Sequence, residues 1–322
     1  MDNPFFSIIC GVYNRENMIG RCIQSCLDQS FTDFEIVVVD DGSTDNSLKT
    51  LQSFNDPRLR IYQHDQNRGI SPARYTAVTN SRGKWIVGVD SDWTLYPNCL
   101  LRFYEVSQNL PPEIIAIRAR HLWEDGSITP SFVPKQPIGY IDRIKWVEVE
   151  GGSDALPCYR REIIIKNISP DRRGGLESYY QLNIAQQGLV LYLEDILCKQ
   201  YKSAANSTTR GNPKTRIQNL KKNAPDMIWM YEKTLEEHGE ALRLYGPNQY
   251  KNLFRNISVQ YFYSGNRLAG TKCLIKYLKM KPFDIPSWFV FPLGWIGPGA
   301  MIYGNILHNY ISRLRVRFRV SK

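Results

Sequence analysis

The 322-residue sequence predicts an α/β fold with a mostly parallel central sheet flanked by helices. Two observations predict it. Over the first hundred residues, short apolar runs alternate with segments of helical period, which is the rhythm of strand, helix, strand. The first run, FSIICGVY, is almost continuously apolar and the second, FEIVVVDD, is largely so, as in strands that helices cover on both faces. The chain is also long enough to bury a substantial core.

Four strands and three helices are expected in strict alternation. This alternation predicts a mostly parallel sheet whose crossovers are right-handed. Ser71 and Pro72 stand where a helix N-cap and a first helical residue are favoured. The expected strands are 6–13, 34–41, 58–65 and 84–92, and the expected helices are 14–30, 42–54 and 71–81.

The charge is unevenly distributed along the chain. Residues 1–150 carry 15 Lys and Arg against 19 Asp and Glu, whereas residues 151–322 carry 26 against 12. A basic half can face nucleic acid, anionic lipid or only solvent. No helix-turn-helix, zinc-finger or RNA-recognition signature occurs, so nucleic acid is not expected as a partner.

The cysteines and the N-terminus bear on the compartment. Seven cysteines are scattered along the chain, and this odd number favours buried reduced thiols over a disulfide framework or a zinc site. The first residues include no basic region of the kind that opens a signal peptide. A cytoplasmic protein is therefore expected.

In a parallel sheet, ligands bind beyond the carboxyl ends of the strands. The chemistry is thus expected at residues 11–14, 40–45 and 90–93, where polar side chains follow the apolar runs. No G-x-G-x-x-G follows the first strand, and no G-x-x-x-x-G-K occurs. A dinucleotide dehydrogenase and a P-loop phosphotransferase are therefore disfavoured.

Asp90 and Asp92 end the fourth strand. Two residues apart in an extended segment, their side chains point the same way and can approach one cation. Mg²⁺ or Mn²⁺ takes one or two carboxylates and completes its shell with water and phosphate oxygens. The pattern favours a metal site over a simple polar turn. Asp40 and Asp41 end the second strand, where one could anchor the loop and the other accept from a ligand.

Four segments together resemble the successive motifs of family 2 glycosyltransferases. They are SIICGVYNRE, FTDFEIVVVDDGSTD, NRGISPARYTA and GKWIVGVDSD. The resemblance is strong over residues 5–100 and weak over 150–210. It implies an inverting nucleotide-sugar transferase with the GT-A fold, which uses Mn²⁺ or Mg²⁺ and a nucleotide-diphosphate sugar donor.

The resemblance also implies roles for single residues. Gly11, Tyr13 and Asp41 would bind the donor, with Tyr13 and Asp41 at the nucleotide base. Arg74 would lie near the diphosphate, and Asp90 would bind the donor and the metal. Asp92 would be the more direct metal ligand.

Two positions depart from the family pattern. An acid is common where this chain has Trp93, whose ring could stack on a donor or acceptor sugar or could cover the core. The general base often comes from a Glu-Asp pair at a helix start, and the matching pair here is Glu177-Ser178. Glu177 is the candidate base, and Asp154 is a second carboxylate that could face the acceptor. Asp195 is disfavoured because it lies within a strand pattern.

Three domains are expected: a GT-A domain over 1–210, a helical appendage over 211–281 and a membrane-associating tail over 282–322. Lys202 and Arg210 are candidate phosphate contacts in the loop that ends the first. Residues 285–312 lack Asp, Glu, Lys and Arg, and RLRVRFRVSK then brings five basic residues. Several prolines and glycines disfavour a simple spanning helix. Segments lying on anionic lipid are favoured, and a span, a re-entrant hairpin, a buried oligomer contact and an edge strand stay open.

These patterns predict a metal-dependent inverting glycosyltransferase at the inner face of the plasma membrane. Its acceptor would be a lipid-linked sugar or a polysaccharide in bacterial surface glycan synthesis. The alternative is a catalytically silent nucleotide-sugar-binding protein, which the replacement of the usual acid by Ser178 favours.

Overall fold

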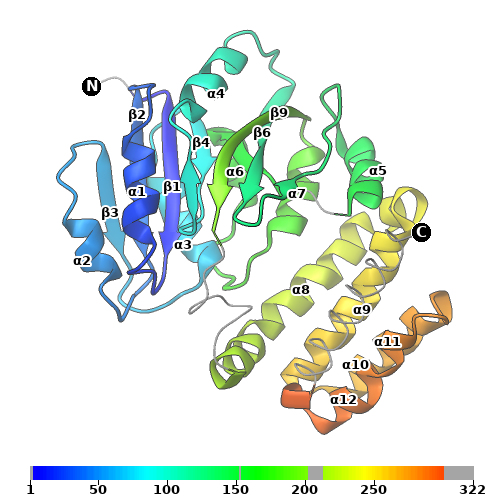
Figure 1. Cartoon of the computed structure of the whole chain (residues 1–322). Helices are drawn as coiled ribbons and strands as arrows, with labels where there is room; N and C mark the ends of the chain where they lie inside the picture. Colours follow the sequence, from blue (N-terminus) through cyan, green and yellow to red (C-terminus); the bar gives the residue numbers. More distant parts are fainter. Residues whose placement is uncertain (1–2, 152–153, 202–212, 301–322) are drawn as a thin grey trace. The chain divides into compact units, whose positions relative to one another are not determined.

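The computed structural model describes residues 3–151, 154–201 and 213–300. The chain divides into two compact units, residues 1–206 and 207–322 (Figure 1). This boundary lies near the expected one at residue 210, and residues 282–300 belong to the second unit. Lys202, Arg210 and the basic end of the chain lie outside the described residues.

The first half of the first unit has the predicted alternation. Strands β1 to β4 pair in parallel in the order β3-β2-β1-β4, with helices between them. The predicted fold class is confirmed. In chain order the elements are β1 Phe6–Val12, α1 Ile19–Leu27, β2 Phe34–Asp40, α2 Ser47–Gln52, β3 Leu59–Gln63, α3 Ile70–Asn80 and β4 Trp85–Gly88.

The second half of this unit extends the sheet with mixed directions. Strand β8 runs antiparallel to both β4 and β6, β9 is parallel to β6, and β5 is antiparallel to β9. The full order is β3-β2-β1-β4-β8-β6-β9-β5, and β7 pairs with β6. These elements are β5 Trp93–Leu95, α4 Cys99–Ser107, β6 Ile114–Trp123, β7 Ile128–Thr129, α5 Tyr140–Glu150, β8 Leu156–Arg160, α6 Arg161–Asn167, α7 Glu177–Ala185 and β9 Leu189–Gln200.

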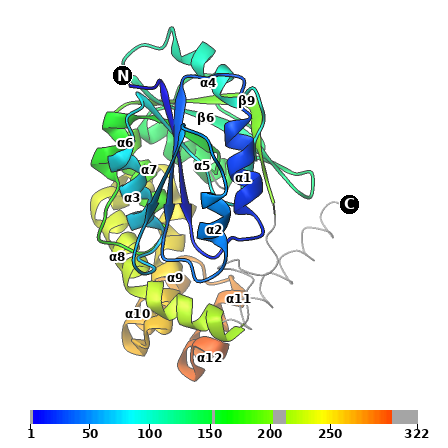
Figure 2. The same ribbon diagram turned by 90° about the vertical axis from the view of Figure 1, so that its left-hand side faces the viewer.

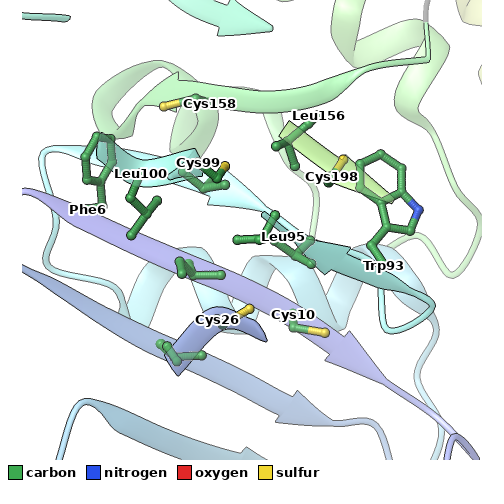
Figure 3. Packing of buried hydrophobic residues seen from close by; sticks show 14 of the residues in the cluster. Phe6, Cys10, Cys26, Trp93, Leu95, Cys99, Leu100, Leu156, Cys158 and Cys198 are labelled. Atoms are coloured by element: carbon green, nitrogen blue, oxygen red, sulfur yellow. The ribbon is translucent and has the colours of Figure 1, made fainter. Parts of the chain in front are cut away.

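Helices cover both faces of the sheet. Figure 2 shows α1 on one side of the sheet and α3, α6 and α7 on the other. One apolar cluster joins α1 and α4 to the sheet, and the other joins α3, α6 and α7 to the opposite face. Figure 3 shows the first cluster, in which several cysteines pack among apolar side chains. Six of the seven cysteines are buried and all seven are free thiols, as the sequence predicts.

Ser71 does not cap α3 as predicted. The helix begins at Ile70 after Gly69, and the Ser71 hydroxyl donates to the Gly174 carbonyl at 2.6 Å. The residue lies inside the first turn, so its side chain is free to reach the segment that precedes α7. This hydrogen bond ties α3 to the segment that carries Glu177.

The second unit is helical. It contains α8 Pro213–Tyr245, α9 Pro247–Ser264, α10 Arg267–Met280, α11 Ile285–Trp288 and α12 Val290–Ile296. A separate core joins α8, α9, α10 and α12 around Phe262, Leu274 and Tyr277. Among the residues that the structure describes, no helix combines the length and the hydrophobicity that a membrane span needs.

Candidate active site

Two loops meet at the carboxyl edge of β1 and β2. Asn14 has a left-handed backbone (φ 52°), its N–H donates to Ser43 Oγ at 3.0 Å, and its side chain accepts from the Thr44 N–H at 2.8 Å. Tyr13 is 42% exposed at this edge. Gly11 lies in β1, where an added Cβ would come within 3.3 Å of Ala73 and Ile70 in α3. The glycine therefore lets α3 lie close to the sheet.

The two acids at the end of β2 both accept hydrogen bonds from other groups of the protein. Asp40 is buried and its Oδ2 accepts from the Ser43 N–H at 3.1 Å, while its Oδ1 has no hydrogen-bond partner in the described part of the chain. Asp41 accepts from Asn67 Nδ2 and from the N–H groups of Arg68 and Gly69.

A fourth partner completes the surroundings of Asp41. Nδ1 of His64 lies 2.7 Å from Asp41 Oδ1, so each carboxylate oxygen has two contacts. Arg173 also contacts this loop. Its backbone carbonyl accepts from the Ile70 N–H, and its guanidinium donates to the Asn67 carbonyl at 2.6 Å. Asp41 is thus the anchor of the 67–69 loop in this structure.

Arg74 joins two predicted site residues that are far apart in the sequence. Its guanidinium donates to Asp90 at 2.8 Å and to Glu177, which opens α7. Burial alone lowers the Arg74 pKa, but the carboxylates of Glu177 and Asp90 outweigh it and raise the pKa. Both carboxylate side chains stay nearly half exposed, so this ion-pair cluster faces solvent.

Asp90 and Asp92 lie in a turn, not in the extended segment that the sequence predicts. Strand β4 ends at Gly88, and the Trp93 N–H closes the turn on the Asp90 carbonyl at 2.9 Å. Gln200 Nε2 lies 3.4 Å from Asp92 Oδ2. Burial, and then the charge of Asp90, raise the pKa of Asp92. The turn still places both acids at one end of the sheet.

The donor set fits a hard divalent cation. No group of three or more His, Cys, Asp and Glu side chains able to hold a metal occurs within the described residues. Two carboxylates leave most of the coordination shell to other oxygens, as Mg²⁺ and Mn²⁺ require when they bind phosphates. The raised pKa of Asp92 marks a carboxylate that a nearby positive charge would stabilise.

The structure buries Trp93, the predicted donor-binding residue whose ring could stack on a sugar. The side chain is 3% exposed and packs in the core beside Leu95 and Cys198 (Figure 3). Its ring stacks on His121 with centroids 4.9 Å apart and planes tilted by 30°. A ring enclosed in this way has no free face for a sugar. The alternative that the sequence left open, a ring that covers the core, matches these surroundings.

Asp154 lies near the Arg74 cluster, just before β8. The residue is exposed. Partial desolvation by the surrounding protein, and then the charge of Asp90, raise the pKa of its carboxyl to about 6, against the effect of Arg118. Asp195 forms an ion pair with Arg102 of α4 at 3.0 Å and lies outside this cluster.

Arg118 and Arg15 act electrostatically on candidate site residues and were not predicted from the sequence. Arg118 is buried on β6, where it donates to the Tyr159 hydroxyl and lowers the pKa of Asp154. In the same way, the charge of Arg15 lowers the pKa of Asp92. The only sequence signal for Arg118 was an arginine that interrupts the apolar run of β6.

The fold is GT-A-like and is shared with the solved structures described below. A sequence model described as glycosyl transferase family 2 matches residues 7–167, half of the chain. The chain therefore belongs to glycosyl transferase family 2.

Relatives and solved structures agree with this family. The chain is 37% identical to chondroitin synthase of Escherichia coli over 128 residues, which are 39% of this chain and 18% of the synthase. It is 32% identical to the E. coli glucosyltransferase WfgD over 146 residues, 45% of this chain and 57% of that enzyme. The aligned regions cover less than two thirds of either relative.

Two solved structures share the fold. Residues 1–349 of TarS from S. aureus, in complex with UDP-GlcNAc, match 93% of this chain and 88% of theirs with a TM-score of 0.57 at 18% identity. A mannosyltransferase from Pyrobaculum calidifontis, in complex with GDP-Man and Mn²⁺, matches 96% and 88% with a TM-score of 0.53 at 15% identity.

Proposed function

We propose that this chain is a metal-dependent inverting glycosyltransferase of bacterial surface glycan synthesis. It would move a sugar from a nucleotide-diphosphate donor to a lipid-linked or polysaccharide acceptor. The observation that carries the proposal is the contact of Arg74 with both Asp90 and Glu177. A guanidinium suited to a phosphate, a carboxylate suited to a metal (Asp90) and a carboxylate suited to an acceptor hydroxyl (Glu177) thus meet at one edge of the sheet.

The names of the relatives support the donor and acceptor classes. Chondroitin synthase makes a polysaccharide by name, and WfgD is named for glucose transfer from UDP-Glc to a diphosphoundecaprenol-linked GlcNAc. TarS holds UDP-GlcNAc, and the mannosyltransferase holds GDP-Man with Mn²⁺.

Asp92 and Asp90 would hold Mn²⁺ or Mg²⁺ against the donor diphosphate. When bound, the cation neutralises charge on the departing diphosphate. Arg74 already contacts Asp90 and can add a guanidinium to the same phosphates. Binding of donor phosphates would draw Arg74 from Asp90 and leave that carboxylate to the cation.

Glu177 is the proposed general base. Its carboxylate would take the proton of the acceptor hydroxyl as that oxygen bonds to the anomeric carbon from the face opposite the diphosphate. The bond between the anomeric carbon and the phosphate oxygen breaks, its electron pair leaves with the diphosphate, and the anomeric configuration inverts. Asp154 is the second candidate, because it lies near the Arg74 cluster with a raised pKa.

Tyr13, Gly11 and the acids that end β2 would receive the nucleoside. Tyr13 is exposed for stacking on the base. A base N–H that bonds to Asp41 would have to share or replace one of its present donors. Asp40 is fully buried, so Asp41 is the acid proposed at the base.

The alternative is a silent nucleotide-sugar-binding protein. It keeps the donor site but has no base, and Ser178 beside Glu177 is the residue that favours it. Incubation with a panel of UDP- and GDP-sugars in Mn²⁺ separates the two functions. Release of nucleotide from one donor supports the transferase, and binding of nucleotide without turnover of any donor supports the silent protein.

The enzyme would work in the cytoplasm as a peripheral protein at the inner face of the plasma membrane, where lipid-linked acceptors are presented. We expect an anionic membrane surface as a partner because the second half of the chain is basic and its C-terminal segment is apolar.

A further inference from the structure

The second unit exposes apolar side chains at an unusual density near its end. Sixteen large hydrophobic residues are exposed in the described chain, and seven of them fall within residues 283–296. Phe283 is 93% exposed and Ile296 is 73% exposed. Single exposed hydrophobic residues are ordinary on soluble proteins, but a cluster of this kind marks a surface that contacts something apolar.

Helix α12 has an inner and an outer face. Val290 and Gly294 are buried against the core, and an added Cβ at Gly294 would overlap the Phe262 ring. On the outer face, the rings of Phe291 and Trp295 lie 6.2 Å apart. The glycine therefore holds the helix tightly to the unit while the aromatic rings stay outside.

The outer face of α10 adds positive charge. Leu268, Lys272, Ile275 and Lys279 are exposed at helical spacing, opposite the buried residues Leu274 and Tyr277. Five Lys and Arg residues occur from 267 to 281, and the next acid is Asp284.

Helices α10 and α12 form one continuous surface. The Trp295 indole donates to Thr271 Oγ1 of α10 at 3.1 Å, and the guanidinium of Arg267 lies 5.9 Å from the Trp295 ring centre. A cation and an exposed indole thus stand side by side. Asp284 accepts from the Ser287 and Tyr277 hydroxyls, so this acid is held within the unit.

We propose that α10, α11 and α12 form a docking surface for an anionic lipid bilayer. Indole and phenyl rings favour the headgroup boundary, and lysines beside them attract anionic headgroups. Charge and hydrophobicity together fit a bilayer better than a second copy of this basic chain. The proposal deepens the proposed function by naming the surface that would bring the enzyme to a lipid-linked acceptor.

The test is co-sedimentation of the full chain with vesicles, without any nucleotide sugar. Vesicles of phosphatidylcholine with one third phosphatidylglycerol are compared with vesicles of phosphatidylcholine alone. We expect binding to the anionic vesicles and little binding to the neutral ones. Failure to bind anionic vesicles would overturn the proposed docking surface. It would not bear on the proposed transferase activity, which is measured separately.

Two sets of variants locate the surface. Phe283→Ser with Ile296→Ser, and Lys272→Glu with Lys279→Glu, should each weaken vesicle binding about tenfold or more. The matched controls are Val149→Ser with Leu244→Ser, and Lys145→Glu with Lys222→Glu, at exposed positions elsewhere. Equal binding by the first variants and the wild type, or a stable dimer that these substitutions dissociate, would overturn the proposal.

Discussion

The guanidinium of Arg74 on α3 lies 2.8 Å from the carboxylate of Asp90, and its other arm reaches Glu177. The three residues are separated by 16 and 103 positions in the chain. The guanidinium of Arg74 therefore contacts both Asp90, a candidate metal ligand, and Glu177, the candidate base.

The first prediction concerns this bridge. Arg74→Ala should lower kcat/KM at least about a hundredfold, because both the phosphate contact and the position of Glu177 are lost. Arg74→Lys should recover little, since a single ammonium cannot reproduce the two-armed contact. Steady-state kinetics measure both, with Arg102→Ala as a control for the loss of an arginine ion pair at the surface. A near-normal rate in Arg74→Ala would remove Arg74 from the site.

The second prediction concerns the metal. Asp92→Ala should abolish the Mn²⁺-dependent part of nucleotide binding, because the half-buried carboxylate that a cation would stabilise is gone. Isothermal titration with UDP and GDP, with and without Mn²⁺, measures this. Asp195→Ala should bind as the wild type does. Unchanged Mn²⁺ dependence in Asp92→Ala would rule out this residue as the ligand.

The third prediction separates the two candidate bases. Glu177→Gln should lower kcat by about 10²- to 10⁴-fold with little change in donor affinity, whereas Asp154→Asn should cost less than about tenfold. A base must be deprotonated, so a reaction that used Asp154 would slow as the pH falls through about 6, its raised pKa. We expect the pH profile of Asp154→Asn to keep the acid limb of the wild type. A large loss of kcat in Asp154→Asn with a small loss in Glu177→Gln would instead identify Asp154 as the base.

The fourth prediction concerns Trp93. Trp93→Ala should destabilise the fold by about 3 to 5 kcal/mol, because it empties the space beside Leu95 and Cys198. Trp93→Phe should cost less and leave donor KM within about twofold. Chemical denaturation and kinetics measure these effects, with Trp146→Phe as a control in the other apolar cluster. A large rise in KM without loss of stability would instead indicate that the ring contacts a sugar.

The fifth prediction concerns His121, the partner of Trp93. Burial lowers its pKa to about 4, and neither ring nitrogen has a hydrogen-bond partner in the described part of the chain. The unfolded chain then binds the proton first, so stability should fall as the pH drops from about 6.5 to about 4, by roughly 2 to 3 kcal/mol.

His121→Phe tests this, because it keeps an aromatic partner for Trp93 and removes the titrating group. Denaturation curves between neutral pH and pH 4 should show a shallower loss of stability than in the wild type, and equal or higher stability at neutral pH. An unchanged pH dependence would mean that other groups cause it.

Much of the fold could be predicted because the parallel strands are buried on both faces. The runs that became β1, β2 and β4 are mostly apolar, and their ends locate the acids at one edge. The antiparallel β8 and the long β9 carry no comparable local signal of direction, since direction depends on which strand they pair with. The Asp90 to Trp93 turn was misjudged for a similar reason, because its closing hydrogen bond is not visible in the pattern of residue types.

The residue pattern alone predicts the edge of the sheet that carries the candidate site and the residue types there: carboxylates after buried strands, an arginine on the third helix and an acid at a later helix start. Which of these residues meet depends on how the chain folds in three dimensions. Arg74 contacts Glu177 because Ser71 and Gly174 tie their segments together. Trp93 lies in the core because β5 pairs with β9 and places the ring on His121. Contacts between residues a hundred positions apart depend on strand pairing and packing, and residue pattern alone does not encode them locally.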